Sequence, residues 1–223
     1  MARRGDLDGW WQFGVIVVGA LMRVFLRVRV TGVERIPEAG PAILASNHLS
    51  ALDGVVLALV VGRDGRRMTR FLIAAEFFRK PAFAWALRVY RQIPLRRGEG
   101  DADALDETIR AVRAGAIAGI FPEGLVNPSP LVGLQRGRSG VARIALASGA
   151  LVVPVGIWGT QLRYPKSGLH FRRPWRPTVA LAFGAPISAY GDPSSVDDVQ
   201  RFTGIVMDGI AECLDDARRL AEV

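Results

Sequence analysis

One short segment carries the residue types that acid–base chemistry needs: NHLSALD, residues 47–53. An imidazole changes its protonation state near neutral pH, so a histidine is suited to take a proton from a hydroxyl nucleophile. A carboxylate bound to the other ring nitrogen would fix the tautomer and stabilise the imidazolium. On one continuous helix, five residues turn about 500°, which would leave His48 and Asp53 roughly 140° apart. The two side chains can therefore pair only if the chain bends between them.

The same segment also fits the start of a helix. Ser50 and Asp53 have the spacing of a capping box, in which an acid three residues after the cap bonds back to the amide of the cap. In this interpretation the carboxylate serves the backbone and His48 has no catalytic role. The two interpretations do not conflict, because a strand, a turn and a helix start would let Ser50 cap the helix that presents Asp53 to His48.

The surrounding chain alternates apolar strands with helices. Strands are predicted at 25–36, 40–48, 69–76, 116–124, 150–159 and 178–187, a short extended piece at 91–97, and helices at 51–61, 81–90, 101–115, 139–149 and 195–220. Strands with almost no polar residue need cover on both faces. The sequence therefore predicts an α/β fold with a mixed, largely parallel central sheet covered by helices. Ligands in such sheets bind at the carboxyl ends of strands, where His48 and Glu123 are expected.

Residues 10–22, WWQFGVIVVGALM, are the most apolar segment of the chain. The segment is shorter than the roughly 20 residues of a membrane span. Paired tryptophans at its start, arginines after its end and Asp8 as an N-cap favour a helix at a membrane interface. An ordinary helix docked on the protein core is the alternative. We divide the chain into an N-terminal interfacial segment, residues 1–29, and a single domain, residues 30–223.

Composition narrows the possible partners. The net charge of +8 favours anionic partners, although 29 basic residues with only two lysines can also reflect a genomic composition bias. No nucleic-acid partner is expected, because the sequence lacks a basic helix, zinc-ligand spacing or aromatic residues interleaved with arginines. The single cysteine, Cys213, excludes a disulfide framework within the chain and lies in a helical apolar pattern, so a buried thiol is predicted.

Three further motifs follow the histidine segment in order: IPLRRG at 93–98, IFPEG at 120–124 and VVPVGI at 152–157. Together with NHLSALD, they resemble the glycerolipid acyltransferases of the 1-acylglycerol-3-phosphate O-acyltransferase (PlsC-like) family. The resemblance implies acyl transfer from an acyl thioester, on coenzyme A or acyl carrier protein, to the free hydroxyl of a lysophospholipid. With 1-acylglycerol-3-phosphate as the acceptor, the product would be phosphatidic acid. No cofactor and no metal are implied.

The resemblance also implies roles for individual residues. His48 would be the general base and Asp53 the carboxylate that orients it. Arg96 would bind the acceptor phosphate through the bidentate geometry of its guanidinium, and Glu123 with Gly124 would form part of the acceptor site. Read without the resemblance, Arg96 belongs to a solvated loop and Glu123 is an acid in a turn.

The third motif departs from the family pattern. The Phe-Pro-Glu-Gly block usually continues with Thr or Ser and then Arg, whereas Leu125, Val126 and Asn127 follow it here. Arg136 and Arg138, just before the predicted helix at 139–149, are candidates to replace the missing charge, helped by the amides at the start of that helix. Alternatively, the acceptor is a different polar lipid or a glycolipid, or the chain is a catalytically silent lipid-binding member of the fold.

Lipid acceptors are amphiphiles, so the protein is expected to collect them from a bilayer and to be membrane-associated on the cytoplasmic face. Basic loops fit an anionic membrane surface, where each basic residue near the lipid contributes roughly 1 kcal/mol. The basic residues in question are Arg66, Arg67, Arg79 and Lys80.

Overall fold

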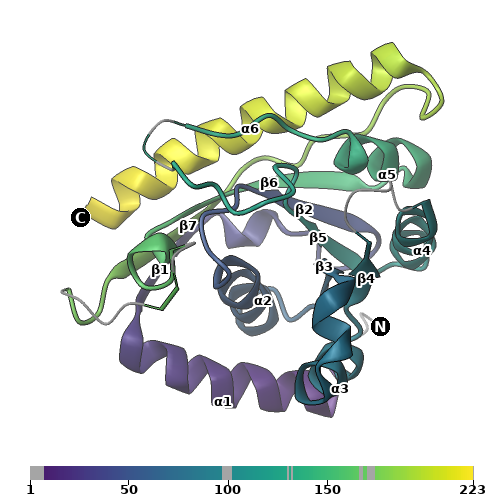
Figure 1. The fold of residues 1–223 in the computed structure, drawn as a ribbon. Coiled ribbons are helices and arrows are strands. Elements are labelled where there is room, and N and C mark those ends of the chain that lie inside the picture. Colours follow the sequence, from purple (N-terminus) through teal and green to yellow (C-terminus); the bar gives the residue numbers. More distant parts are fainter. Residues whose placement is uncertain are drawn as a thin grey trace.

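The computed structural model describes residues 8–96, 102–129, 131, 133–165, 168–169 and 174–222 of the chain. Within these residues, seven strands form one sheet in the order β1-β7-β6-β2-β5-β3-β4 (Figure 1). The strands are β1 (Arg27–Thr31), β2 (Ala42–Ser46), β3 (Thr69–Ala74), β4 (Ile93–Leu95), β5 (Ile117–Ile120), β6 (Leu151–Trp158) and β7 (Thr178–Phe183). All neighbouring pairs are parallel except β6 with β7. The predicted mixed, largely parallel sheet is confirmed.

Helices cover both faces of this sheet (Figure 1). They are α1 (Gly9–Phe25), α2 (Asp53–Arg63), α3 (Pro81–Val89), α4 (Ala102–Arg113), α5 (Gly140–Ser148) and α6 (Val196–Glu222). One apolar cluster joins α1 and α2 to one face, and a second joins α4, α5 and α6 to the other. The molecule is therefore a three-layer α/β sandwich, as the uninterrupted apolar strands require.

The central strand β2 shows why the sequence folds this way. All five of its residues are buried. Successive side chains of a strand point to opposite faces, so Ala42 and Leu44 join the cluster beneath α2 while Ile43 and Ala45 join the cluster beneath α5 and α6. A strand without a polar face can only lie between two layers of helices, and it delivers His48 to the edge of the sheet.

Helix α1 has a packed side and an exposed side. The carboxylate of Asp8 accepts the amide of Trp11 at 3.0 Å, which confirms the predicted N-cap. Trp11 is buried against Tyr90, with ring centroids 5.3 Å apart, whereas Trp10 and Phe13 are more than half exposed. Among the helices of the described residues, none has both the length and the apolar character that crossing a bilayer demands. The strand β1 begins at Arg27, so the sheet already starts inside the segment 1–29, and the division at residue 29 stays a prediction.

Two sequence-based expectations about single residues have different outcomes. Arg67 does not belong to a basic surface loop: its side chain is buried and donates to the carbonyl oxygens of Pro37 and Gly115, at 3.0 and 2.6 Å. The prediction was wrong because a guanidinium can serve several backbone carbonyls at once. Cys213 is a buried thiol, as predicted, and burial raises its pKa to about 11.

The close approach of α6 to β6 yields a stability prediction. A Cβ added at Gly156 would lie 2.1 Å from the backbone carbonyl carbon of Cys213. We expect Gly156→Ala to lower the free energy of unfolding by about 2 kcal/mol or more, because α6 must move away from the sheet. Urea unfolding measures the change. Gly204→Ala is the matched control, because its Cβ meets nothing within 4 Å and alanine favours the helix; equal destabilisation of both variants would contradict the prediction.

Candidate active site

The sheet register brings three of the predicted site residues to one level. Ala45 of β2 pairs with Ile120 of β5, so His48 and Glu123 each lie three residues beyond an aligned pair. Through β3, the same register continues to Ile93 of β4, which places Arg96 three residues beyond the same line. His48, Glu123 and Arg96 therefore leave the same edge of the sheet, as the carboxyl-end rule predicts.

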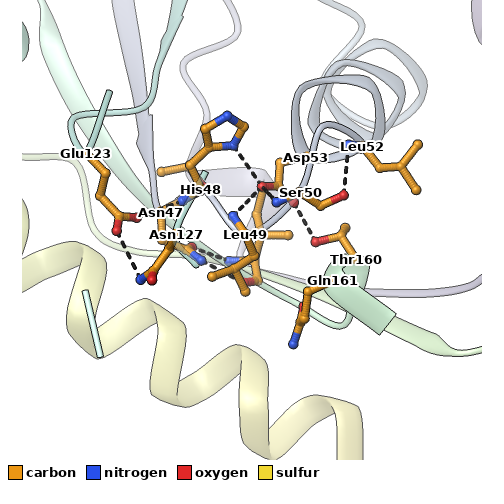
Figure 2. Close-up of polar contacts among 12 residues, drawn as sticks. Asn47, His48, Leu49, Ser50, Leu52, Asp53, Glu123, Asn127, Thr160 and Gln161 are labelled. Atoms are coloured by element: carbon orange, nitrogen blue, oxygen red, sulfur yellow. Dashed lines mark hydrogen bonds and ion pairs between the residues drawn. The ribbon is translucent and has the colours of Figure 1, made fainter. Parts of the chain in front are cut away.

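The centre of the site is the carboxylate of Asp53, which is fully buried at the first turn of α2. Its Oδ2 accepts the amides of Leu49 and Ser50, at 2.6 and 2.8 Å, and lies 3.0 Å from His48 Nδ1. Its Oδ1 accepts the hydroxyl of Thr160 at 2.5 Å (Figure 2). A buried carboxylate needs such partners, because burial without hydrogen bonds is costly.

The chain between His48 and Asp53 makes the bend that a continuous helix would not allow. The Asp53 amide donates to the Ser50 carbonyl at 3.1 Å, and the Leu52 amide donates to Ser50 Oγ at 3.0 Å. Ser50 Oγ itself donates to the carbonyl of Tyr164 at 2.6 Å. The carboxylate thus bonds back to the amide three residues earlier and also contacts the imidazole. Asp53 therefore pairs with His48 and accepts the Ser50 amide, but the prediction that Ser50 caps the helix was wrong, because α2 begins at Asp53 with Leu52 at the N-cap position.

The His48 ring is oriented from two sides. Its Nδ1 faces Asp53, and its plane stacks on Phe121, with centroids 4.2 Å apart and an angle of 16°. The side chain keeps 16% of its surface exposed. Nε2 points away from the Asp53 cluster and has no hydrogen-bond partner within the described part of the chain (Figure 2). This nitrogen is the group that can accept a proton from a bound molecule.

Glu123 is tied into the protein rather than pointing into open space. Its Oε1 accepts the His48 amide at 2.8 Å, and its Oε2 accepts the Gln135 amide at 2.8 Å. Asn127 lies 3.3 Å from the same oxygen through Nδ2, and its backbone amide donates to the His48 carbonyl at 2.7 Å. The loop after β5 thus holds both backbone groups of the histidine. The predicted role of Glu123 in acceptor binding stays a prediction.

The other predicted binding residues are Gly124, Arg138, Arg136 and Arg96. Gly124 adopts a left-handed φ of +74°, and a Cβ there would lie 2.6 Å from Arg138 Nε. Arg138 is exposed, and its amide donates to the Pro122 carbonyl at 2.8 Å, so the residue packs on the turn that follows β5. Arg136 and Arg96 are also exposed. Their binding to phosphate stays a prediction.

Sequence reasoning missed two of the polar anchors. Thr160 follows the carboxyl end of β6, so the same edge rule that selected His48 could have selected it. The side-chain amide of Asn47 donates to the carbonyl of Ile157 at 2.9 Å, and its oxygen accepts the Ile157 amide at 2.7 Å. Asn47 thus extends the pairing of β2 with β6 by one rung. No sequence pattern predicts Ile157 as the partner of Asn47.

Within the described residues, no group of three or more His, Cys, Asp or Glu side chains is placed to hold a metal ion. The cluster offers a partly exposed imidazole edge with a carboxylate behind it, on a sheet edge where ligands bind. Such a pair can deprotonate a hydroxyl or an amine and return the proton to a leaving group.

Comparison with known proteins gives concordant results. Residues 27–158 match the model of the Acyltransferase family. The chain is 31% identical over 167 residues to an uncharacterized protein of Mycobacterium leprae, and 30% identical over 168 residues to the N-acylphosphatidylethanolamine synthase of Arabidopsis thaliana. These alignments cover 69% and 70% of this chain, but only 43% and 58% of the relatives. The crystal structure of the 1-acyl-sn-glycerophosphate acyltransferase PlsC from Thermotoga maritima matches with a TM-score of 0.67 and 28% identity, over 91% of this chain and 77% of the other.

The Asp53 cluster predicts the tautomer of the neutral His48 ring. Because Nδ1 faces a carboxylate, which can only accept, we expect the proton on Nδ1 and the lone pair on Nε2. Nitrogen-15 NMR of histidine-labelled protein at neutral and alkaline pH distinguishes the two tautomers. The Asp53→Ala variant is expected to shift the neutral ring toward the Nε2-protonated form. A neutral ring protonated on Nε2 in the wild-type protein would contradict the proposed pairing.

Proposed function

Because the chain belongs to the acyltransferase family, we propose that it transfers an acyl group from an acyl thioester to the free hydroxyl of a lysophospholipid. The acceptor proposed first is 1-acylglycerol-3-phosphate, which gives phosphatidic acid in phospholipid biosynthesis. The donor is acyl-coenzyme A or acyl carrier protein. The observation that carries the proposal is the oriented His48 ring, whose Nδ1 is held by buried Asp53 and whose Nε2 is left for a substrate.

In the proposed reaction, the acceptor hydroxyl gives its proton to Nε2 of His48 as its oxygen attacks the thioester carbonyl carbon. The carbon–sulfur bond then breaks, and the imidazolium returns the proton to the departing sulfur. The products are an oxygen ester and a free thiol. Asp53 stabilises the transient imidazolium, while Thr160 and the amides of Leu49 and Ser50 hold the carboxylate in place. A thioester is already activated, so no covalent intermediate on the protein is needed.

The proposed acceptor carries a phosphate, so the site needs cations that bind it. The loop residues Leu125, Val126 and Asn127 provide no cation beside Glu123, and Asn127 is committed to protein contacts. Arg138 packs on Gly124, because its Nε would lie 2.6 Å from a Cβ added at the glycine. We therefore propose Arg138 and Arg136 as the groups that bind the acceptor phosphate. The Arabidopsis relative is named for a product acylated on nitrogen, so an amine-bearing phospholipid is the second candidate acceptor.

The decisive assay measures free thiol released from palmitoyl-coenzyme A, with and without 1-acylglycerol-3-phosphate. We expect thiol release to require both the acceptor and His48. The rate of release should fall about 10² to 10⁴-fold in His48→Ala, the range that general base catalysis supplies. His170→Ala is the matched control, because it removes the other of the two histidines of the chain and should leave the rate unchanged.

Two outcomes of this assay would change the proposal. His48-dependent release only with another acceptor, such as phosphatidylethanolamine or a glycolipid, would reassign the acceptor and keep the reaction. No release with any donor, including palmitoyl-acyl carrier protein, would favour the catalytically silent lipid-binding member of the fold. In that case lipid binding should be the same in the wild-type protein and in His48→Ala.

We further propose that the protein works at a membrane surface, on the cytoplasmic face. Exposed apolar side chains of α1 and α3 gather on one side of the molecule, and Trp10 packs edge-on against Trp85 at 5.5 Å. This apolar surface consists of Trp10, Phe13, Ile16, Leu21, Val24, Phe83 and Trp85. An exposed patch of this kind, rich in tryptophan, is typical of interaction with a membrane interface.

The membrane proposal is tested by flotation with phosphatidylglycerol vesicles. We expect Trp10→Ser combined with Phe13→Ser to reduce the bound fraction at least about fivefold, because two large apolar side chains no longer enter the interface. The control is Tyr190→Ser combined with Val196→Ser, which removes exposed apolar side chains outside the apolar surface. Equal vesicle binding by both double variants would refute the proposal that the apolar surface contacts the membrane.

A further inference from the structure

A partly open cavity of about 530 Å³ lies between α1, β1 and α2. Apolar residues form most of its walls and include Met22, Leu26, Val28, Val56 and Val60. The volume falls in the range of about 300 to 1,000 Å³ that is usual for small-molecule sites. The opening joins the apolar surface of α1 through Ile16, which lines the cavity and is 69% exposed. A hydrocarbon chain could therefore pass from a membrane into the cavity without crossing a polar barrier.

The charged residues of the cavity are all of one sign. Its lining contains arginines and neither aspartate nor glutamate; the arginines are Arg23, Arg27, Arg29, Arg63 and Arg176. Three of these are engaged, since Arg63 pairs with Asp64, Arg29 donates to the Leu220 carbonyl and Arg176 donates to the Leu26 carbonyl.

The remaining two arginines are available to a ligand. Arg23 and Arg27 are exposed and make no side-chain hydrogen bond or ion pair to any residue in the described ranges. They sit beside an apolar cavity, where a guanidinium can bind an anion in bidentate fashion while the hydrocarbon part of the ligand is buried.

Arg27 of the cavity lies at the same edge of the sheet as the candidate active site. Arg27 pairs with Thr178 of β7, and Trp158 of β6 pairs with Ala180, so Arg27 is level with Thr160. Thr160 holds Asp53, and two strand spacings, roughly 10 Å, separate the backbones of β1 and β6. The arginines are thus beside the His48 centre but separate from the residues that form it.

We propose that this cavity binds one membrane phospholipid with an anionic head group. A hydrocarbon chain lies between α1 and α2, and Arg23 and Arg27 bind the phosphate. The bound lipid would hold α1 against the domain and anchor the protein next to its catalytic edge. This inference is independent of the acyl-transfer reaction, because a bound lipid needs neither His48 nor a donor.

The test is isothermal titration of the full chain with dihexanoyl phosphatidylglycerol below its micelle concentration. We expect one site per chain and weaker binding of the zwitterionic dihexanoyl phosphatidylcholine. Arg23→Gln combined with Arg27→Gln should weaken phosphatidylglycerol binding at least about tenfold, because two charge-assisted contacts are lost. The control is Arg110→Gln combined with Arg143→Gln, which removes the same charge from α4 and α5 on the opposite face of the sheet.

A second variant tests the cavity itself. The Cβ of an alanine at Gly19 would have only Leu59 within reach, at 4.0 Å, so Gly19→Leu should fold and fill the cavity. We expect it to weaken binding of the lipid but not of inorganic phosphate.

Three results would overturn the proposal. The first is equal phosphatidylglycerol binding by the wild-type protein and the arginine variant. The second is an equal loss of affinity in the control variant, which would indicate only long-range charge attraction. The third is competition: if 1-acylglycerol-3-phosphate displaces the lipid and the arginine variant raises its KM in step, the cavity is the acceptor site and not a separate lipid site.

Discussion

The buried carboxylate of Asp53 is the interaction on which the rest of the site depends. It is removed from water, so its charge must be met by hydrogen-bond donors, and four donors from two parts of the chain, residues 48–50 and Thr160, meet it. Two of them are amides of the turn after β2, one is the hydroxyl of Thr160 after β6, and one is the imidazole. Satisfying the carboxylate therefore fixes the turn, the start of α2 and the histidine ring together. The geometry around His48 follows from the need to satisfy one buried charge.

A second set of contacts fixes the backbone of the histidine from the other side. Glu123 accepts the His48 amide, and Asn127 donates its amide to the His48 carbonyl. The loop after β5 consequently works as a clamp on the residue that carries the imidazole. Leu125 and Val126 stand where the family usually has Thr or Ser and then Arg, so the part of this loop that is well anchored in the protein supports the histidine.

The apolar helix α1 borders both the cavity and the exposed apolar surface. One side of the helix packs on Tyr90 and lines the cavity beside α2, while the other carries exposed tryptophan and phenylalanine side chains. Such a helix has no polar face to turn toward water, which is expected for a helix that contacts lipid. The arginine-lined cavity lies between this helix and the sheet edge that presents His48. An amphiphilic substrate and a bound phospholipid would thus approach the protein from one direction.

The sequence by itself determined the sheet, the order of its elements and the edge at which the chemistry is expected. These follow from local patterns: apolar runs in β2 and β6 that leave no polar face, the N-cap at Asp8, and motifs that end at Asp53 and Glu123. Tertiary structure alone decided the partners. Thr160 is 107 residues from Asp53, Asn47 pairs with Ile157 at a distance of 110 residues, and Arg67 leaves the surface for two distant carbonyls. The residue type shows that a buried carboxylate, amide or guanidinium requires hydrogen bonds. Which distant group forms them depends on how the strands align in the folded protein.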